Sequence, residues 1–202
     1  MNLWYLASLI MVVLIISHNI KKQKRKKASQ EESFWAKEAR ANSVRRKSLD
    51  GLEYIHIPLE DFPTDLLTDN SAVAESIEIL QALSTQPVVN LTGYSNTDLK
   101  LEYGAANLTN LMEYDQNYTL LVRTLQKWAD ILLEAGHTKE AILLMEYAVS
   151  TNTDVSRTYY CLADYRLSQG ETAQVERLIQ IAENLRSPSK KMIVRNLQSR
   201  LS

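Results

Sequence analysis

The stretch LQKWADILLEAGHTKEAILLMEYAV (125–149) decides the fold, because the chain repeats its pattern 34 residues later as YYCLADYRLSQGETAQVERLIQIAE (159–183). Around these stretches, nine residue pairs are identical at this one offset: Arg123/Arg157, Thr124/Thr158, Ala129/Ala163, Asp130/Asp164, Leu133/Leu167, Gly136/Gly170, Thr138/Thr172, Leu144/Leu178 and Ala148/Ala182. Ordinary composition would give roughly two identities by chance. A fixed period of this length is typical of stacked helical hairpins.

Small residues fall where the packing of such hairpins requires them. Ala129 and Ala163 allow the two helices of one hairpin to approach closely. Gly136 and Gly170 supply the permissive backbone with which a helix ends in a short turn. After Pro188 the apolar residues recur at helical spacing, which predicts a final helix that caps the stack. These apolar residues are Ile193, Leu197 and Leu201.

The two copies resemble the tetratricopeptide (TPR) repeat, a helix–turn–helix unit of 34 residues. The slots of the family pattern hold Leu125, Trp128, Ala129, Gly136, Ala141, Met145 and Ala148 in the first copy, and Tyr159, Leu162, Ala163, Gly170, Val175, Ile179 and Ala182 in the second. The second copy departs from the pattern at Val175, which replaces an alanine, and at Arg166, which replaces a large apolar residue. Thr153 stands where the family often has proline. The resemblance covers residues 122–189 and implies a protein-binding module without catalytic chemistry.

In the TPR family, the first helix of each unit lines a concave groove that holds a partner. The resemblance implies that Arg123, Gln126, Asp130, Leu133, Arg157, Tyr160, Asp164 and Leu167 line this groove, with Lys191 on the cap. The family's Lys/Asn/Arg set for a terminal carboxylate is absent, because Gln126 and Asp130 occupy two of its slots. The alternative interpretation is that these residues form solvated helix faces with local ion pairs, each of which stabilises by tenths of a kcal/mol.

The first twenty residues carry no charged side chain. Eighteen of them form an apolar run that is long enough to cross a hydrocarbon core of about 30 Å as a helix. A cleaved signal peptide would need a preceding basic region and a small-residue cleavage site, and neither is present. A single transmembrane helix is therefore expected, with a buried or interfacial helix as the alternative.

A basic run, KKQKRKK (21–27), follows the apolar residues directly. Its charges are Lys21, Lys22, Lys24, Arg25, Lys26 and Lys27. The positive-inside rule places this run in the cytoplasm and the N-terminus outside, and we expect a bacterial inner membrane. Anionic lipid is the expected contact, because no aromatic residue interleaves the run to stack on nucleic-acid bases.

Charge divides the chain into an apolar, a basic and an acidic part. Residues 21–48 carry eleven Lys and Arg against three Glu, which is a net charge of +8. The whole chain carries −1, so residues 49–202 carry −9. Phe34, Trp35 and Ala39 form an apolar stripe in the basic part. We expect them to pack on the protein's own core, and the alternative is that they lie on the membrane.

The whole chain has only five glycines and four prolines, which favours helices, and its middle part has helical spacing. The pattern predicts a short extended segment near 52–57, a helix over 71–84 capped by Ser71, and a helix from 96 to about 112. The next helix is expected to begin at Asp115 or Asn117 and to run into the repeats.

No pattern in the sequence points to catalysis, a metal, a cofactor or a small-molecule substrate. The histidines His18, His56 and His137 are scattered, and the chain lacks a Gly-rich phosphate loop and a nucleophile motif. Cys161, the single cysteine, falls inside a repeat helix.

The sequence thus predicts an all-α fold in four parts. They are a transmembrane anchor (1–20), a basic juxtamembrane stalk (21–50), a helical region with a short extended segment (51–121), and two TPR-like repeats with a cap (122–202). We expect a membrane-tethered adaptor that binds a protein or peptide partner, with no nucleic acid involved. The alternative is a structural subunit of a membrane complex whose anchor helix makes the main contacts.

Overall fold

The structure is a computed structural model that describes residues 3–201, except for the side chains of 3, 5–10, 12–15, 28 and 29. The predicted all-α class is confirmed, since the described residues form helices and no β-strand beyond one isolated bridge between Tyr54 and Val89. The helices are α1 (Leu3–Ser43), η1 (Leu59–Asp61), α2 (Ser71–Ser84), α3 (Asn96–Tyr103), η2 (Ala105–Asn107), α4 (Leu108–Glu134), α5 (Thr138–Ser150), α6 (Ser156–Ser168), α7 (Thr172–Glu183) and α8 (Lys190–Leu201).

The chain divides into two compact units. Unit 1 comprises residues 1–47 together with 96–107, and unit 2 comprises 48–95 together with 108–202. Unit 1 is therefore built from two stretches of sequence that are separated by the first part of unit 2.

In unit 1, α3 packs on the C-terminal end of α1, and most of the contacts are polar. Ala41 of α1 and Leu99 of α3 are the buried apolar residues there. Glu38 accepts hydrogen bonds from Lys100 and from the Thr97 hydroxyl, the latter at 2.7 Å. These two donors lower the pKa of the Glu38 carboxyl.

Gly104 ends α3, so the single helix predicted over 96–112 is wrong. Its φ of 91° lies in the left-handed region, and a Cβ at this position would stand 2.4 Å from the carbonyl oxygen of Arg45. Three residues later the buried Asn107 donates to the carbonyls of Lys47 and Tyr103, at 2.7 and 2.8 Å. The turn between α3 and α4 is thereby attached to the chain that follows α1.

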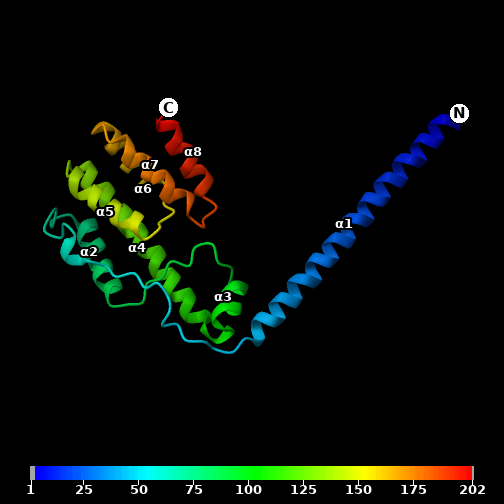
Figure 1. The fold of residues 1–202 in the computed structure, drawn as a ribbon, viewed down its shortest axis with the longest axis horizontal. Coiled ribbons are helices and arrows are strands. Elements are labelled where there is room, and N and C mark those ends of the chain that lie inside the picture. Colours follow the sequence, from blue (N-terminus) through cyan, green and yellow to red (C-terminus); the bar gives the residue numbers. More distant parts are fainter. Residues whose placement is uncertain (1–2, 202) are drawn as a thin grey trace. The chain divides into compact units, whose positions relative to one another are not determined.

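Unit 2 is an apolar core covered by α2 and by the successive helices α4 to α8 (Figure 1). Its largest fully buried side chains are Trp128, Tyr159, Leu80, Leu111, Leu121, Leu125, Leu132, Leu144, Met145, Leu162, Ile193 and Leu197. Ile193 and Leu197 belong to the expected cap helix α8, whereas Leu201 is 36% exposed.

The helix boundaries of unit 2 follow the 34-residue period. The helices α4 and α6 end at Glu134 and Ser168, and α5 and α7 begin at Thr138 and Thr172. Gly136 has a φ of 85° and Gly170 a φ of 76°, as the predicted turns require. The predicted helix–turn–helix arrangement at both glycines is confirmed, and membership of the TPR family stays a prediction.

Two details between α2 and α4 differ from expectation. The predicted bounds of α2 are confirmed, but its cap is Asn70, whose side-chain oxygen accepts from the backbone of Ala72 at 2.9 Å. The helix expected to begin at Asp115 or Asn117 already begins at Leu108. Asp115 and Asn117 instead hold the connector over 86–95, as Asp115 accepts from Leu91 N at 3.1 Å and Asn117 donates to Pro87 O at 3.0 Å.

The predicted anchor over 1–20 lies largely outside the residues whose side chains are described. Residues 3–20 are part of the helix α1, and within the described residues no helix offers an apolar stretch long enough to cross a membrane. Farther along α1, no described residue of unit 1 covers Phe34, Trp35 and Ala39, and the expectation that they pack on a core stays a prediction. All three are exposed, and the rings of Phe34 and Trp35 contact each other edge to face at 5.4 Å.

Candidate partner-binding surfaces

Several of the predicted groove residues form a polar row across α4, α6 and α8. The first cluster of the row joins α4 to α6. Arg157 of α6 donates through Nε to both carboxylate oxygens of Asp130 on α4, at 2.8 and 3.0 Å. Gln126 donates to Asp130 at 2.9 Å and accepts from the Thr158 hydroxyl at 2.6 Å. The charges of this cluster are therefore fixed by contacts between two helices.

The second cluster joins α6 to α8 in a similar way. Arg200 donates to Asp164 through Nε at 2.8 Å, and its guanidinium lies 4.8 Å from the centre of the Tyr160 ring. The hydrogen bond with Asp164 raises the pKa of Arg200 above its ordinary value. The cap helix therefore continues the row, but through Arg200, which the sequence analysis did not identify.

The remaining predicted groove residues take different positions. Arg123 and Lys191 are exposed, whereas Leu133 and Leu167 are half-buried and pack against the core. The alternative interpretation predicted local ion pairs on a solvated face, and ion pairs do form here. These pairs nevertheless join different helices, because their partners are 27 and 36 residues apart.

Cys161 lies beside the polar row and is half-buried. Burial raises the pKa of its thiol, with Arg157 acting in the opposite direction, so the thiol stays protonated at neutral pH. In the described part of the chain, no three His, Cys, Asp or Glu side chains gather in a way that could hold a metal ion.

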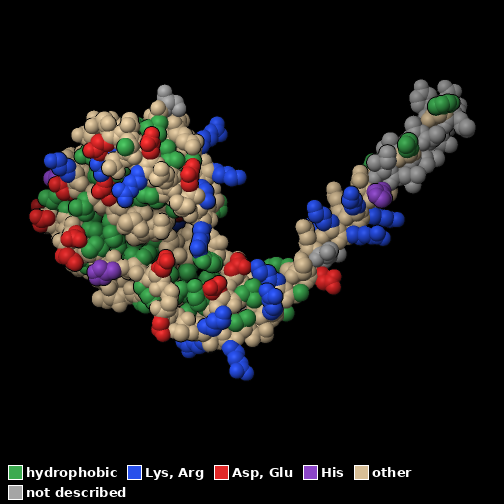
Figure 2. Space-filling view, viewed as in Figure 1, with side chains coloured by type: hydrophobic (Ala, Val, Ile, Leu, Met, Phe, Trp, Pro, Cys, Tyr) green, Lys and Arg blue, Asp and Glu red, His purple; other side chains and the backbone are tan. Residues whose placement is uncertain are grey.

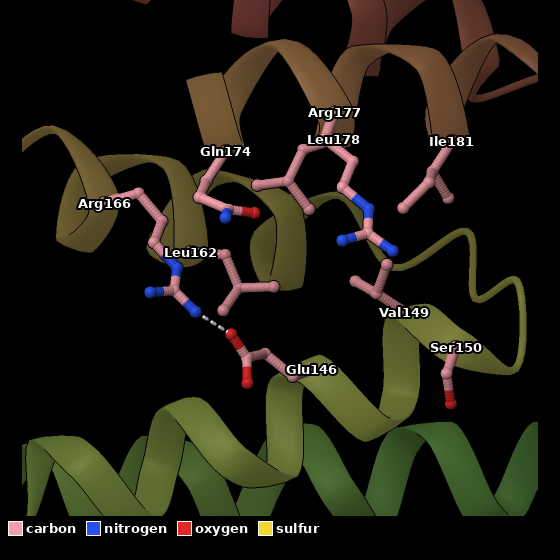
Figure 3. Close-up of a pocket in the computed structure, with 9 residues that line it drawn as sticks. All are labelled: Glu146, Val149, Ser150, Leu162, Arg166, Gln174, Arg177, Leu178 and Ile181. Carbon is pink, nitrogen blue, oxygen red and sulfur yellow. Dashed lines mark hydrogen bonds and ion pairs between the residues drawn. The ribbon is translucent and has the colours of Figure 1, made fainter. Parts of the chain in front are cut away.

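A half-open cleft lies between α5 and α7, with α6 as its floor (Figure 3). Its volume is about 450 Å³, and its lining consists of Glu146, Val149, Ser150, Leu162, Arg166, Gln174, Arg177, Leu178 and Ile181. Leu162, Leu178 and Val149 give it an apolar base, and two arginines stand at its walls.

The two arginines of the cleft differ in their partners. Arg166 forms ion pairs with Glu146 and with Glu171, the latter at 2.6 Å. Arg177 is exposed and points from α7 toward Val149 (Figure 3), and it makes no ion pair with any described residue. The cleft therefore offers one guanidinium whose charge is not balanced by a carboxylate of the described chain.

Sequence reasoning missed this cleft, although Arg166 gave a signal. Leu132 holds the corresponding position of the first hairpin and is fully buried. In the second hairpin, the arginine extends outward to Glu146 and Glu171 instead of filling the space between helices. The replacement of an apolar residue by arginine in a repeat position thus marks the opening.

The basic run of the stalk lies on α1 of unit 1. Lys21, Lys22, Lys24, Arg25, Lys26 and Lys27 are all exposed. Figure 2 shows Lys and Arg side chains gathered around this part of α1. The predicted stalk is helical as far as Ser43, and the run presents six cations over less than two helical turns.

Comparison of the chain with protein-family models, with curated proteins and with solved structures finds no match.

Proposed function

We propose that this chain is a membrane-tethered adaptor that holds a protein or peptide partner on the polar row of unit 2. The observation that carries the proposal is the extension of the row over three helices, α4, α6 and α8, with its charges fixed by contacts between helices. A surface whose side chains are ordered before binding loses less entropy when the partner arrives.

The chemistry of the row indicates the kind of partner. Arg157 and Asp164 have side chains that are 61% and 62% exposed, so both signs of charge face the solvent. Tyr160 adds an aromatic surface between them. A peptide with alternating charges and an apolar side chain suits this row, because opposite charges placed along an interface fix its register.

The tether is the apolar leader over 1–20 followed by the basic run over 21–27. In this proposal the leader spans a bacterial inner membrane with the N-terminus outside. The basic run then contacts anionic headgroups, at about 1 kcal/mol for each basic residue. The acidic part of the chain stands in the cytoplasm.

Photocrosslinking at position 160 in intact cells tests the adaptor role. A photoreactive residue there, in the full chain, should capture one protein, which mass spectrometry identifies. The control places the same residue at position 143, where the exposed Leu143 lies on α5 outside the row. Capture of lipid alone, or of the same proteins at both positions, would contradict the proposal.

The exposed Phe34 and Trp35 favour a second candidate, in which α1 itself makes the main contacts inside a membrane complex. Deletion of residues 1–28 separates the two. An adaptor should keep its position-160 partner after the deletion, whereas a subunit held by α1 should leave its complex. Co-purification from cells before and after the deletion gives the answer.

A further inference from the structure

An acidic and aromatic patch on α1 is left without a partner in unit 1. We call residues 31–35 of α1 the arm. Its Phe34 and Trp35 are 53% and 65% exposed, and Glu31 and Glu32 make no ion pair with any described residue. Because residues three and four apart share a helix face, both carboxylates flank Trp35. An exposed aromatic pair of this size is characteristic of a protein contact.

The cleft of unit 2 has the complementary chemistry. Its base of Leu162, Leu178 and Val149 suits an aromatic ring, and its volume of about 450 Å³ lies in the range of sites that enclose organic groups of that size. Arg177 stands at the rim with an unbalanced charge, where a carboxylate beside the ring would meet it.

We propose that the arm of one copy of this chain binds in the cleft of a second copy, with Trp35 against the apolar base and Glu31 or Glu32 paired with Arg177. Residues 49–202 carry a net charge of −9, which disfavours a strongly acidic ligand. The arm is not strongly acidic as a ligand, because the positive charges of the basic run and of Lys37 flank its two carboxylates. Ionic screening confines the attraction to the neighbourhood of Arg177.

The contact joins two different surfaces, so it could also continue from copy to copy, and it closes with the fewest copies when two chains exchange arms. A reciprocal exchange uses both arms and both clefts, and it ends at a dimer. Copies attached to the same membrane would meet at a high effective concentration, which favours such an exchange at a modest intrinsic affinity. The polar row of the proposed adaptor is not used in this contact.

A labelled peptide with the sequence of residues 30–41 tests the contact directly. The receptor is the full chain held in lipid nanodiscs. It carries Phe34→Ala and Trp35→Ala, so that its own arm cannot compete with the peptide. Fluorescence anisotropy should show saturable binding, which Arg177→Glu should weaken at least about tenfold, one unit of log affinity being about 1.4 kcal/mol. Arg177→Lys should retain part of the binding.

The matched control is Arg123→Glu in the same receptor, because Arg123 is an exposed arginine on α4 outside the cleft. Binding that Arg123→Glu leaves unchanged and Arg177→Glu removes would support the proposal. Absence of binding at about 1 mM peptide, or equal binding to both variants, would overturn it. Because position 160 lies outside the cleft, the crosslinking result of the adaptor test stands apart from this one.

Mixing two defective chains gives a second test. A chain with Phe34→Ala and Trp35→Ala lacks the arm, and a chain with Arg177→Glu lacks the cleft, so each alone should be monomeric by light scattering. Their mixture should form one-to-one pairs, since one intact arm still meets one intact cleft. A wild-type chain that stays monomeric, or a mixture that forms no pairs, would overturn the exchange.

Discussion

In unit 1, α3 is attached to α1 by ionised and hydrogen-bonded side chains, whereas in unit 2 the helices α4 to α8 bury a continuous apolar core. Unit 1 buries Ala41 and Leu99 and otherwise relies on the carboxylate of Glu38 and its partners. Exposed ion pairs contribute up to about 1 kcal/mol each, whereas each fully buried large apolar side chain contributes about 1.5–3 kcal/mol. We therefore expect α3 to separate from α1 under conditions that leave unit 2 folded.

Removal of a core side chain should give the largest difference between the units. Trp128→Ala should lower the stability of unit 2 by about 3–5 kcal/mol, because Trp128 is fully buried and packs edge to face with Phe62. Leu99→Ala should loosen α3 alone. Urea unfolding measures the first effect, and hydrogen exchange of residues 96–103 measures the second. An equal shift of the main unfolding midpoint by both substitutions would show that the units unfold together.

Two glycines of positive φ should respond differently to alanine. At Gly136 the space is open, so Gly136→Ala should cost about 1 kcal/mol of backbone strain. At Gly104 a Cβ would collide with the backbone of Arg45, so Gly104→Ala should cost more than about 3 kcal/mol within unit 1. Thermal unfolding measures the loss of stability in Gly136→Ala, and hydrogen exchange of the α3 amides measures the loss in Gly104→Ala. Similar exchange of α3 in both variants would contradict the close approach.

Alkaline pH should weaken unit 2 through its buried tyrosines. Burial raises the pKa of Tyr118 from 10.0 to about 12, so this residue stabilises the fold fully below about pH 10 and loses that contribution as the pH rises toward 12. The shift corresponds to about 2–3 kcal/mol. Tyrosinate absorbance and unfolding curves across this range measure the effect. Tyr118→Phe should reduce the pH dependence, and an unchanged slope would exclude Tyr118 as its source.

Acid should act on unit 1, with a smaller effect. Hydrogen bonds from Lys100 and Thr97 lower the pKa of Glu38 below 4.5, so its contribution is present above that pH and is lost as the pH falls through the folded value. The protection factors of the α3 amides, which are corrected for the slower intrinsic exchange in acid, should therefore fall as the pH falls. Glu38→Gln should lower these protection factors at neutral pH and make them less dependent on pH. Protection that persists in acid would contradict the polar character of unit 1.

The sequence predicted the helices of unit 2 better than their side-chain partners. The 34-residue period located both turn glycines. In the structure, both glycines have a positive φ, and buried residues recur at equivalent positions of the two hairpins. The partners of Asp130 and Asp164 could not be derived in this way, since Arg157 and Arg200 stand at different offsets and depend on how the helices pack.

Other differences arose where tertiary contacts overrode local preference. Helical spacing continues through Gly104, yet the approach of Arg45 requires a glycine with positive φ there. Asp115 and Asn117 have the chemistry of helix caps, but they form hydrogen bonds with the connector over 86–95. The cleft was missed because its volume depends on how α5, α6 and α7 pack, and the arginine at position 166 marks only one of its walls.

The order of the two units along the chain has a mechanical consequence. Residues 96–107 leave unit 2 and return to it, so α3 is covalently attached to that unit at both ends. A pulling force on the N-terminus of α1 would divide between the peptide chain near residue 48 and the noncovalent grip of α3. A protease that cuts the chain near residue 48 would therefore leave α1 bound to the rest of the protein until its noncovalent contacts with α3 dissociate.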